Sequence, residues 1–469
     1  MRRLVRVLPL LLGACASVEE HRDAALQSAR DDFAARSGVE APSREDHGEA
    51  RVAAALDALL AGELDESTAI RVALLNNRDV RAAYGRLGIG AADLVQAGLL
   101  HNPVFGVEAL FFLDGGTEVD LGLAQPFVDL FWRPLRQRAA EHELAAVGAA
   151  VTHDLVHLVY SVRREFVRIR AAQQLVAMQR RAVDAATASH ELMRELYAAG
   201  NVTAQLLSAE RIGEARARLE LAAAERAARE AREPLNRLLG LWGPHVAWRI
   251  GGELPEDGAA AIDLGRIEGR SVAASLDLIE SRARIDAGAQ RAGLASWKGW
   301  LPDGSLGVSG MREAGDEWAV GPALELELPI FDRGQAKVAA AEAALRMQLD
   351  RHVQIAVEVR AAARLLRDRL EMLTQRARFL RVELVPAQQQ LLHETLQNYN
   401  AMQIGVFQVL AQKQQQLAAV REHLATLRDC WLARIDLEEL LAGSIPPDAS
   451  STYWPGAGAA AAEPDRGGH

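Results

Sequence analysis

Two stretches far apart in the chain place a strand pattern directly before a helix pattern, and this order constrains the fold more than any other feature. In "LELELPIFDRGQ", Leu324 to Gln335, apolar and acidic residues alternate as far as Pro329 and give way to an alanine-rich helical sequence. "LGLAQPFVDLFW", Leu121 to Trp132, repeats the arrangement around Pro126. The repetition predicts an internal duplication in which each half joins strands to a long helix.

Alternating side chains predict one β-hairpin in each half, at residues 103–127 and 304–331, with turns at "DGG" and "AGDE". Each strand has about 10 residues, enough for a tilted strand to cross the hydrocarbon of a membrane. The apolar faces are expected to carry Phe105, Val107, Ala109, Phe111, Leu113, Val119, Leu121, Leu123, Trp318, Val320, Leu324, Leu326 and Leu328. The opposite faces are expected to carry Gly106, Glu108, Glu118, Asp120, Gly122, Ala319, Gly321, Ala323, Glu325 and Glu327.

Four strands cannot close a barrel around a pore, and an open sheet edge in lipid leaves backbone groups unpaired. If the hairpins cross a membrane, several copies of the chain must therefore share one barrel. Two alternatives stay open. The sheet could be soluble and pack its apolar face on helices, or the acidic strand residues could be paired catalytic carboxylates instead of groups that face a water-filled lumen.

Helical patterns occupy most of the remaining chain. Apolar residues recur at spacings of three, four or seven in Arg133–Ala198, and more regularly after Gly334. At ~1.5 Å per residue, each segment makes a rod of about 100 Å. Pro386 is expected to kink the second rod, because proline removes one backbone hydrogen bond. Shorter helices are expected beside the rods, at Ser67–Leu99, Val202–Leu239, Leu264–Trp297 and Ile404–Leu441.

The N-terminus has the pattern of an export signal. Three arginines precede "VLPLLLGA", an apolar run that is too short to span a bilayer. The following "LLGAC" resembles a bacterial lipobox, in which Cys15 is lipidated and becomes the mature N-terminus, and Ala16 in place of aspartate favours the outer membrane. No later apolar run is expected to reach the roughly 20 residues of a membrane helix.

Charge and composition narrow the class of protein. The formal charge of 53 − 63 = −10 is spread along the chain, which argues against a nucleic-acid-binding surface. Aromatic residues make up only 5%, which suits long helices better than sheets. Cys430 alone remains once Cys15 is acylated, so no intramolecular disulfide is expected. The expected segments are a signal peptide 1–14, an N-terminal periplasmic segment 15–66, a first repeat 67–240, a connector 241–263, a second repeat 264–443 and a disordered tail 444–469.

The order of helix, hairpin, rod and helix, given twice behind a lipobox, resembles the TolC-type family of outer-membrane efflux channels. The resemblance covers roughly Ser67 to Leu441. Four motifs carry it in this order: "ALLNNRDVRAAYGRLGIGAADLVQAGLLHNP" (73–103), "YAAGNVTAQLL" (197–207), "GPALELELPIFDRGQ" (321–335) and "VPAQQQLLHETLQNYNAMQIGVFQVLAQ" (385–412).

The resemblance implies a mainly α-helical homotrimer with a membrane β-barrel part. Three copies of the four strands would share one twelve-stranded barrel in outer-membrane lipid, and the long antiparallel helices would form a periplasmic α-barrel. The implied function is a passive efflux duct, without enzymatic chemistry or a cofactor, that meets a periplasmic adaptor protein and an inner-membrane pump. Pro126 and Pro329 would close a strand where barrel becomes tunnel, since proline cannot donate to the ladder. The runner-up is a coiled-coil lipoprotein scaffold without a pore.

In this family the turns after the rods dock the adaptor, with a Tyr or Phe followed by glycine three residues later. The first turn fits this pattern, whereas the second has Met402 where glycine is usual. Gln408 and Ala411 stand where some members carry acidic residues around a closed entrance, which argues against an acidic constriction. The expected docking residues are Tyr197, Gly200, Asn201, Val202, Tyr399, Met402, Gln403 and Ile404.

Two motifs suggest other chemistry. "HDLVH", His153 to His157, spaces two histidines as zinc peptidases do, but Asp154 replaces the glutamate base. Both imidazoles are therefore expected on a solvated helix face, and a peptidase there would require bound zinc. "GIGAAD", Gly88 to Asp93, lacks the third glycine of a dinucleotide loop and follows no strand, so no cofactor or metal is predicted.

Overall fold

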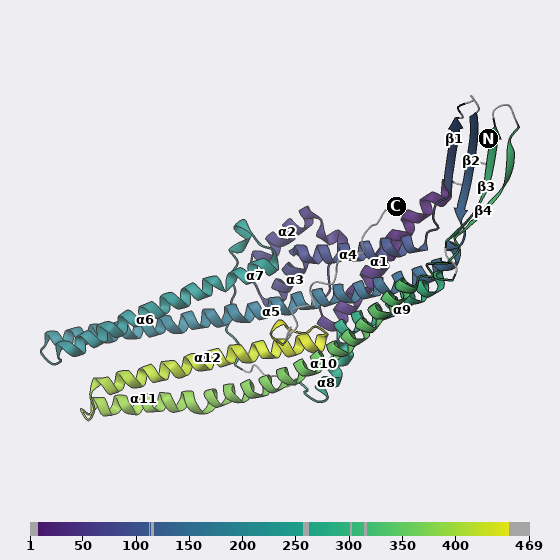
Figure 1. Cartoon of the computed structure of the whole chain (residues 1–469). Helices are drawn as coiled ribbons and strands as arrows, with labels where there is room; N and C mark the ends of the chain where they lie inside the picture. Colours follow the sequence, from purple (N-terminus) through teal and green to yellow (C-terminus); the bar gives the residue numbers. More distant parts are fainter. Residues whose placement is uncertain are drawn as a thin grey trace. The chain divides into compact units, whose positions relative to one another are not determined.

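The structure is a computed structural model, and it describes residues 8–111, 113, 117–256, 262–300, 303–313 and 317–449 (Figure 1). The chain divides into two compact units, which are described separately. Unit 1 comprises Met1–Glu40, Arg81–Asp154 and Leu276–Ala356, and unit 2 comprises Ala41–Val80, Leu155–Ser275 and Val357–His469. Each repeat contributes to both units, so the duplication does not coincide with the division into units.

The described helices follow the predicted order in both repeats. The first repeat and the segment before it contain α1 (Leu8–Ser37), η2 (Arg44–His47), α2 (Glu49–Leu60), α3 (Glu66–Asn76), α4 (Arg78–Gly98), α5 (Asp129–Ala198), α6 (Ala204–Glu230) and α7 (Arg232–Leu239). The connector, the second repeat and the tail contain η3 (Gly243–Val246), α8 (Ile267–Ala274), α9 (Leu276–Lys298), α10 (Gln335–Phe379), η4 (Leu380–Leu384), α11 (Val385–Asn400), α12 (Val406–Ala442) and η5 (Pro447–Ala449).

The helix predicted before each hairpin is broken once, at an equivalent place in the two repeats. Asn77 separates α3 from α4 and Ser275 separates α8 from α9, both with extended ψ values of 128° and 117°. The Asn77 side chain accepts from the amide of Asp79 at 2.7 Å and donates to the carbonyl of Leu238 at 2.9 Å. A short polar side chain that bonds nearby backbone competes with the helix, which accounts for the break at Asn77.

Unit 1 contains the sheet, whose four antiparallel strands have the order β1–β2–β3–β4. Residues opposite each other share the predicted face: Phe105 pairs Leu123, and Leu123 pairs Val308. The strand predicted to reach Phe331 is shorter than expected, because the partner strand begins at Gly304, opposite Leu326. The strands are β1 (Val104–Phe111), β2 (Thr117–Pro126), β3 (Gly304–Glu313) and β4 (Ala319–Leu326).

The rods are confirmed as long helices, and the second contains the expected interruption. The first rod is α5, with 70 residues. In the second, the π-helical turn η4 separates α10 from α11, and the Val385 amide donates to Leu380. Pro386 follows directly. Because Pro386 has no amide proton, it would leave a carbonyl without a partner inside a regular α-helix. The wider π-helical turn before Pro386 costs the helix less than that unpaired carbonyl would.

One expectation about apolar runs is wrong. Among the described residues, α5 is long and apolar enough to cross a membrane by length and composition alone. However, 56% of its most apolar 18-residue window is buried in the fold, as in the core helix of a globular protein. Val151, Val156 and Val162 within this stretch are fully buried. The run is apolar because α5 packs against several neighbours.

The chain around the repeats is more ordered than the sequence predicts. α1 extends to Ser37 and packs in unit 1, where the Thr152 hydroxyl donates to the Ala29 carbonyl at 3.4 Å. In the connector, Trp248 donates to Asn236 at 2.8 Å and lies under the Arg232 guanidinium. The tail expected from residue 444 begins with fully buried Ser444 and the turn η5, so the prediction of disorder is wrong for residues 444–449. Residues 1–7 and 450–469 lie outside the described part.

Candidate functional site: a two-faced sheet and two helical turns

The sheet exposes its apolar face. Phe105, Val107, Val320 and Leu324 are each at least 60% exposed, and no described helix of unit 1 buries them. A continuous apolar surface of this kind is uncommon on a soluble monomer and marks contact with lipid or protein. The alternative of a soluble sheet packed on helices therefore disagrees with the structure.

The other face of the sheet is polar and lined by small residues. Glu108 lies directly opposite Asp120, and Gly106 lies opposite Gly122. Like charges in opposite positions destabilise a sheet unless water screens them, so this face is suited to an aqueous environment. Glu108 is exposed and lies on an open strand, which does not favour the alternative of a catalytic carboxylate pair in a cleft.

The two outer strands offer unpaired edges. β1 pairs only with β2, and β4 pairs only with β3, among the strands that the structure describes. Each outer strand thus presents a row of backbone amides and carbonyls that can accept another strand. The edges could pair with copies of the same sheet, as the barrel prediction requires.

The predicted junction residues lie between strand and helix in both repeats. Pro126 is the last residue of β2, and two residues separate it from Asp129, where α5 begins. Pro329 lies between the end of β4 and the start of α10 at Gln335. The first junction is held by Asp129, which is 6% exposed and pairs with Arg136 and His101. These pairs lower the pKa of Asp129 more than burial raises it.

The predicted docking residues occupy two turns in unit 2, at one end of the paired helices (Figure 1). In the first turn Gly200 has φ +77° and the Asn201 amide donates to Leu196 at 2.9 Å. In the second Met402 has φ +59° and the Gln403 amide donates to Asn398 at 2.9 Å. Both are Schellman-type helix ends with the same hydrogen bonds. The exposed residues at these turns include Tyr197, Gly200, Asn201, Met402 and Gln403, whereas Val202, Tyr399 and Ile404 are partly buried.

The helices behind the turns are clamped by polar side chains. In the first helical hairpin, formed by α5 and α6, Glu214 accepts from His190 at 2.6 Å and from Thr187 at 3.1 Å. The hydrogen bond with His190 is the main reason that the pKa of Glu214 lies below its usual value. In the second helical hairpin, formed by α11 and α12, Gln412 donates to Gln388 at 2.5 Å. A neutral pair thus takes the place of the Glu214 and His190 pair of the first helical hairpin. Arg421 of α12 links the hairpins through Gln179 at 3.3 Å and through Glu220.

The sequence did not predict a buried ionic cluster in unit 2. Glu439 of α12 is fully buried and binds Arg164, His157 at 2.8 Å and Ser444 at 3.2 Å. Arg164 also pairs with Asp436 at 3.2 Å. The expectation that His157 is simply solvated is therefore wrong, since its ring is held by a buried carboxylate. The only signal in the sequence is the acidic "IDLEELL" inside an otherwise apolar stretch.

His153 belongs to a separate cluster in unit 1. Its ring lies 3.6 Å from Asp154 and 3.7 Å from Asp277. Burial lowers the pKa of His153, but these carboxylates raise it more, so the net shift is upward. Burial and the neighbouring acids raise the pKa of Glu280. His153 and His157 thus bind different acids, and the described residues contain no group of three or more side chains suited to a metal ion.

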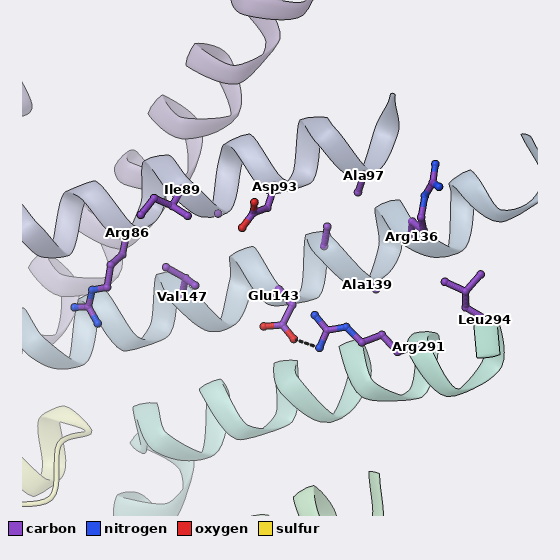
Figure 2. Close-up of a pocket in the computed structure, with 12 residues that line it drawn as sticks. Arg86, Ile89, Asp93, Ala97, Arg136, Ala139, Glu143, Val147, Arg291 and Leu294 are labelled. Atoms are coloured by element: carbon purple, nitrogen blue, oxygen red, sulfur yellow. Dashed lines mark ion pairs between the residues drawn. The ribbon is translucent and has the colours of Figure 1, made fainter. Parts of the chain in front are cut away.

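A cavity of about 560 Å³ lies between α4, α5 and α9 in unit 1. Figure 2 shows Arg291 of α9 directed toward Glu143 of α5, and their closest atoms are 2.7 Å apart. Two further arginines in the lining, Arg86 and Arg136, pair with Asp154 and Asp129. The three arginines of the lining are therefore already paired with carboxylates.

Comparison with known proteins agrees with this geometry. The sequence model of the family described as "Outer membrane efflux protein" matches residues 69–241. No curated protein sequence matches the chain. Among solved structures, the outer membrane protein VceC from Vibrio cholerae is 18% identical with a TM-score of 0.67, and the match covers 81% of this chain and 97% of VceC.

Two other solved structures give similar values. CusC, described in terms of transmembrane channel formation, is 17% identical with a TM-score of 0.68, over 81% of this chain and 93% of CusC. The open-state MtrE outer membrane channel from Neisseria gonorrhoeae is 16% identical with a TM-score of 0.59, over 86% of this chain and 91% of MtrE. Residues 69–241 thus match the outer membrane efflux protein family, and the chain has the fold of outer-membrane efflux channels.

Proposed function

We propose that the protein is the outer-membrane channel of a tripartite efflux system, a passive duct that carries small molecules or ions to the exterior. The single observation that supports this most strongly is the sheet, which is exposed on an apolar face, polar on the other face and unpaired at both edges. A chain with such a sheet needs partner strands before it can enter lipid. The duct performs no catalysis, and the pump that it serves would supply the energy.

The proposed assembly is a homotrimer in which β1 of one copy pairs with β4 of the next. Three sheets of four strands then close one barrel without edges, and the polar faces line a water-filled lumen. Pro126 and Pro329 mark the passage from barrel to helical tunnel. They suit that place because proline cannot donate to a strand ladder.

The proposed partners are a periplasmic adaptor protein and an inner-membrane pump. The adaptor would dock on the two turns of unit 2, whose exposed and partly buried side chains form one end of the paired helices. We further propose that Cys15 anchors the mature chain in outer-membrane lipid. Cys15 lies within α1, and its side chain falls outside the described part of the structure.

Pairing of the outer strands between copies tests this proposal. Val107→Cys in β1 and Val320→Cys in β4, in a Cys430→Ser background, place one thiol on each edge of the sheet. A short bifunctional thiol reagent added to outer membranes is expected to yield covalent trimers. Gln205→Cys with Glu383→Cys, away from the sheet, controls for random coupling. Formation of only monomers would contradict the duct and favour the scaffold without a pore.

A further inference from the structure

The cavity between α4, α5 and α9 has the size and the walls of a small-molecule site. Its volume of about 560 Å³ lies within the range of roughly 300–1,000 Å³ that such sites occupy. Small residues leave the space open, and larger aliphatic side chains close it (Figure 2). Walls of this kind favour the apolar part of a ligand. The aliphatic residues of the lining are Ile89 and Ala97 of α4, Ala139, Ala140 and Val147 of α5, and Leu294 of α9.

The helices around the cavity are held together by close packing and by an ion pair. A Cβ atom added to Gly90 of α4 would lie 3.1 Å from the side chain of Leu144 of α5, so the two helices approach closely there. Arg291 and Glu143 join α9 to α5 at 2.7 Å. The walls of the cavity therefore belong to packed helices and not to a loop.

The N-terminal helix α1 packs on the other side of α5. The hydroxyl of Thr152 donates to the Ala29 carbonyl of α1 at 3.4 Å. Thr152 follows Glu143 by nine residues, which is about two and a half turns at ~3.6 residues per turn. The two side chains thus leave α5 in opposite directions, and α1 lies on the side of α5 that is opposite to the cavity.

One carboxylate of the lining has no paired cation. Asp93 is exposed, and Figure 2 shows its carboxylate on the side of α4 that faces α5. Within the part of the chain that the structure describes, it forms no ion pair and no hydrogen bond through its side chain. Each of the three arginines of the lining is already paired with another acid. The charge of Asp93 therefore favours a ligand with one positive charge.

We propose that this cavity binds a hydrophobic cation with a single positive charge. The aliphatic walls surround the apolar part of the cation, and the Asp93 carboxylate lies opposite its charge. An anion of the same size and shape is disfavoured, because it meets a like charge in the same place. The inference goes beyond the proposed function and does not require it, since the cavity lies within one chain.

Tetraphenylphosphonium and tetraphenylborate test the inference, because these two ions have nearly the same size and shape but opposite charge. The full chain, purified in mild detergent, is titrated with each ion by equilibrium dialysis against detergent without protein. We expect each chain to bind one tetraphenylphosphonium, and to bind it more tightly than tetraphenylborate. Asp93→Asn is expected to weaken the binding of tetraphenylphosphonium roughly fivefold, as for the loss of an exposed ion pair.

Two further variants separate binding in the cavity from binding elsewhere. Glu141→Gln is the matched control, because Glu141 is exposed and lies two residues from Glu143, on the far side of α5. It is expected to leave the binding unchanged. Ala140→Trp fills the cavity and is expected to abolish the binding of tetraphenylphosphonium. Asp93→Asn alters an exposed position, so it keeps the test valid even where Ala140→Trp does not fold.

Two results would overturn the inference. The first is a folded Asp93→Asn or Ala140→Trp variant that binds tetraphenylphosphonium as tightly as the unaltered chain, which would place the ion on the exposed sheet or in the detergent. The second is equal binding of the two ions by the unaltered chain. Neither result bears on the duct, which the coupling of the outer strands tests separately.

Discussion

The two helical turns of unit 2 reach the same geometry from different residues. Both end with a residue of positive φ and a backbone bond that spans five residues, yet that residue is Gly200 in one turn and Met402 in the other. The helices that follow are also capped differently. The Thr203 side chain accepts from the Leu206 amide at 3.3 Å, whereas Gly405 makes no side-chain cap.

This difference teaches that the turn is imposed by the packing of the helices and not only by local preference. A residue with a Cβ atom in the left-handed region costs roughly 1–2 kcal/mol. Met402 adopts that conformation while its side chain is 94% exposed, so its own contacts do not compensate the cost. Conformational strain of this kind is retained where the surrounding structure outweighs it, often at functional surfaces.

The largest effect is expected at the buried ionic cluster that joins α5 of the first helical hairpin to α12 of the second. Glu439→Ala removes a fully buried carboxylate and leaves Arg164 and His157 without it. Breaking a buried ion pair from one side costs about 3–5 kcal/mol. Native-state hydrogen exchange of α5 and α12 measures this loss. Glu422→Ala on the same helix removes an exposed pair with Arg376 and is expected to cost at most about 1 kcal/mol. Equal effects of the two substitutions would contradict the account.

Transplanting the second turn into the first is expected to have the next largest effect. Gly200→Met forces a Cβ atom into φ +77°, with no atom within 4 Å to clash, so the cost is conformational. We expect a local loss of about 1–2 kcal/mol, measured by amide exchange at residues 196–204. Gly213→Met, inside α6 and also free of close contacts, serves as control and is expected to be neutral or stabilising. A neutral Gly200→Met would mean that the first turn does not need glycine.

The reverse exchange sharpens the comparison. Met402→Gly relieves the left-handed strain and is expected to stabilise the second turn by about 1 kcal/mol, less the extra flexibility of glycine in the unfolded chain. Exchange at residues 398–406 measures the gain. Phe407→Gly, at another exposed position in the same hairpin, is expected to destabilise α12 instead. A loss at both positions would show that Met402 makes a contribution that its exposure conceals.

The smallest effect is expected from acid. Because the pKa of Glu214 is lowered from 4.5, its contribution is present above that pH and is lost as pH falls through the lowered value. The first hairpin is then expected to lose amide protection on acidification, after correction for intrinsic exchange. The neutral Gln388 and Gln412 pair predicts no matching loss in the second hairpin. Glu214→Gln removes the difference, and a similar acid response of both hairpins would contradict it.

The sequence was sufficient to predict the main helices and strands, but it did not predict the helix breaks at Asn77 and Ser275 or the long-range polar contacts. Periodicity located the four strands and both rods, because each of these features depends on neighbours close in the chain. The residues of the two turns were expected from the family resemblance. The contact of His157 with Glu439 joins residues 282 positions apart, and no local pattern encodes it. The end of β4 was also missed, because a strand stops where its partner strand stops.

Three-fold assembly of the sheets is the central claim, and imaging tests it most directly. The mature full chain, extracted from outer membranes in mild detergent, is to be examined by electron cryomicroscopy. We predict particles of three copies whose sheets close one barrel inside the detergent belt, with both turns of each copy at the far end of the helices. Monomers, or closed helical rods without a detergent belt, would contradict the account.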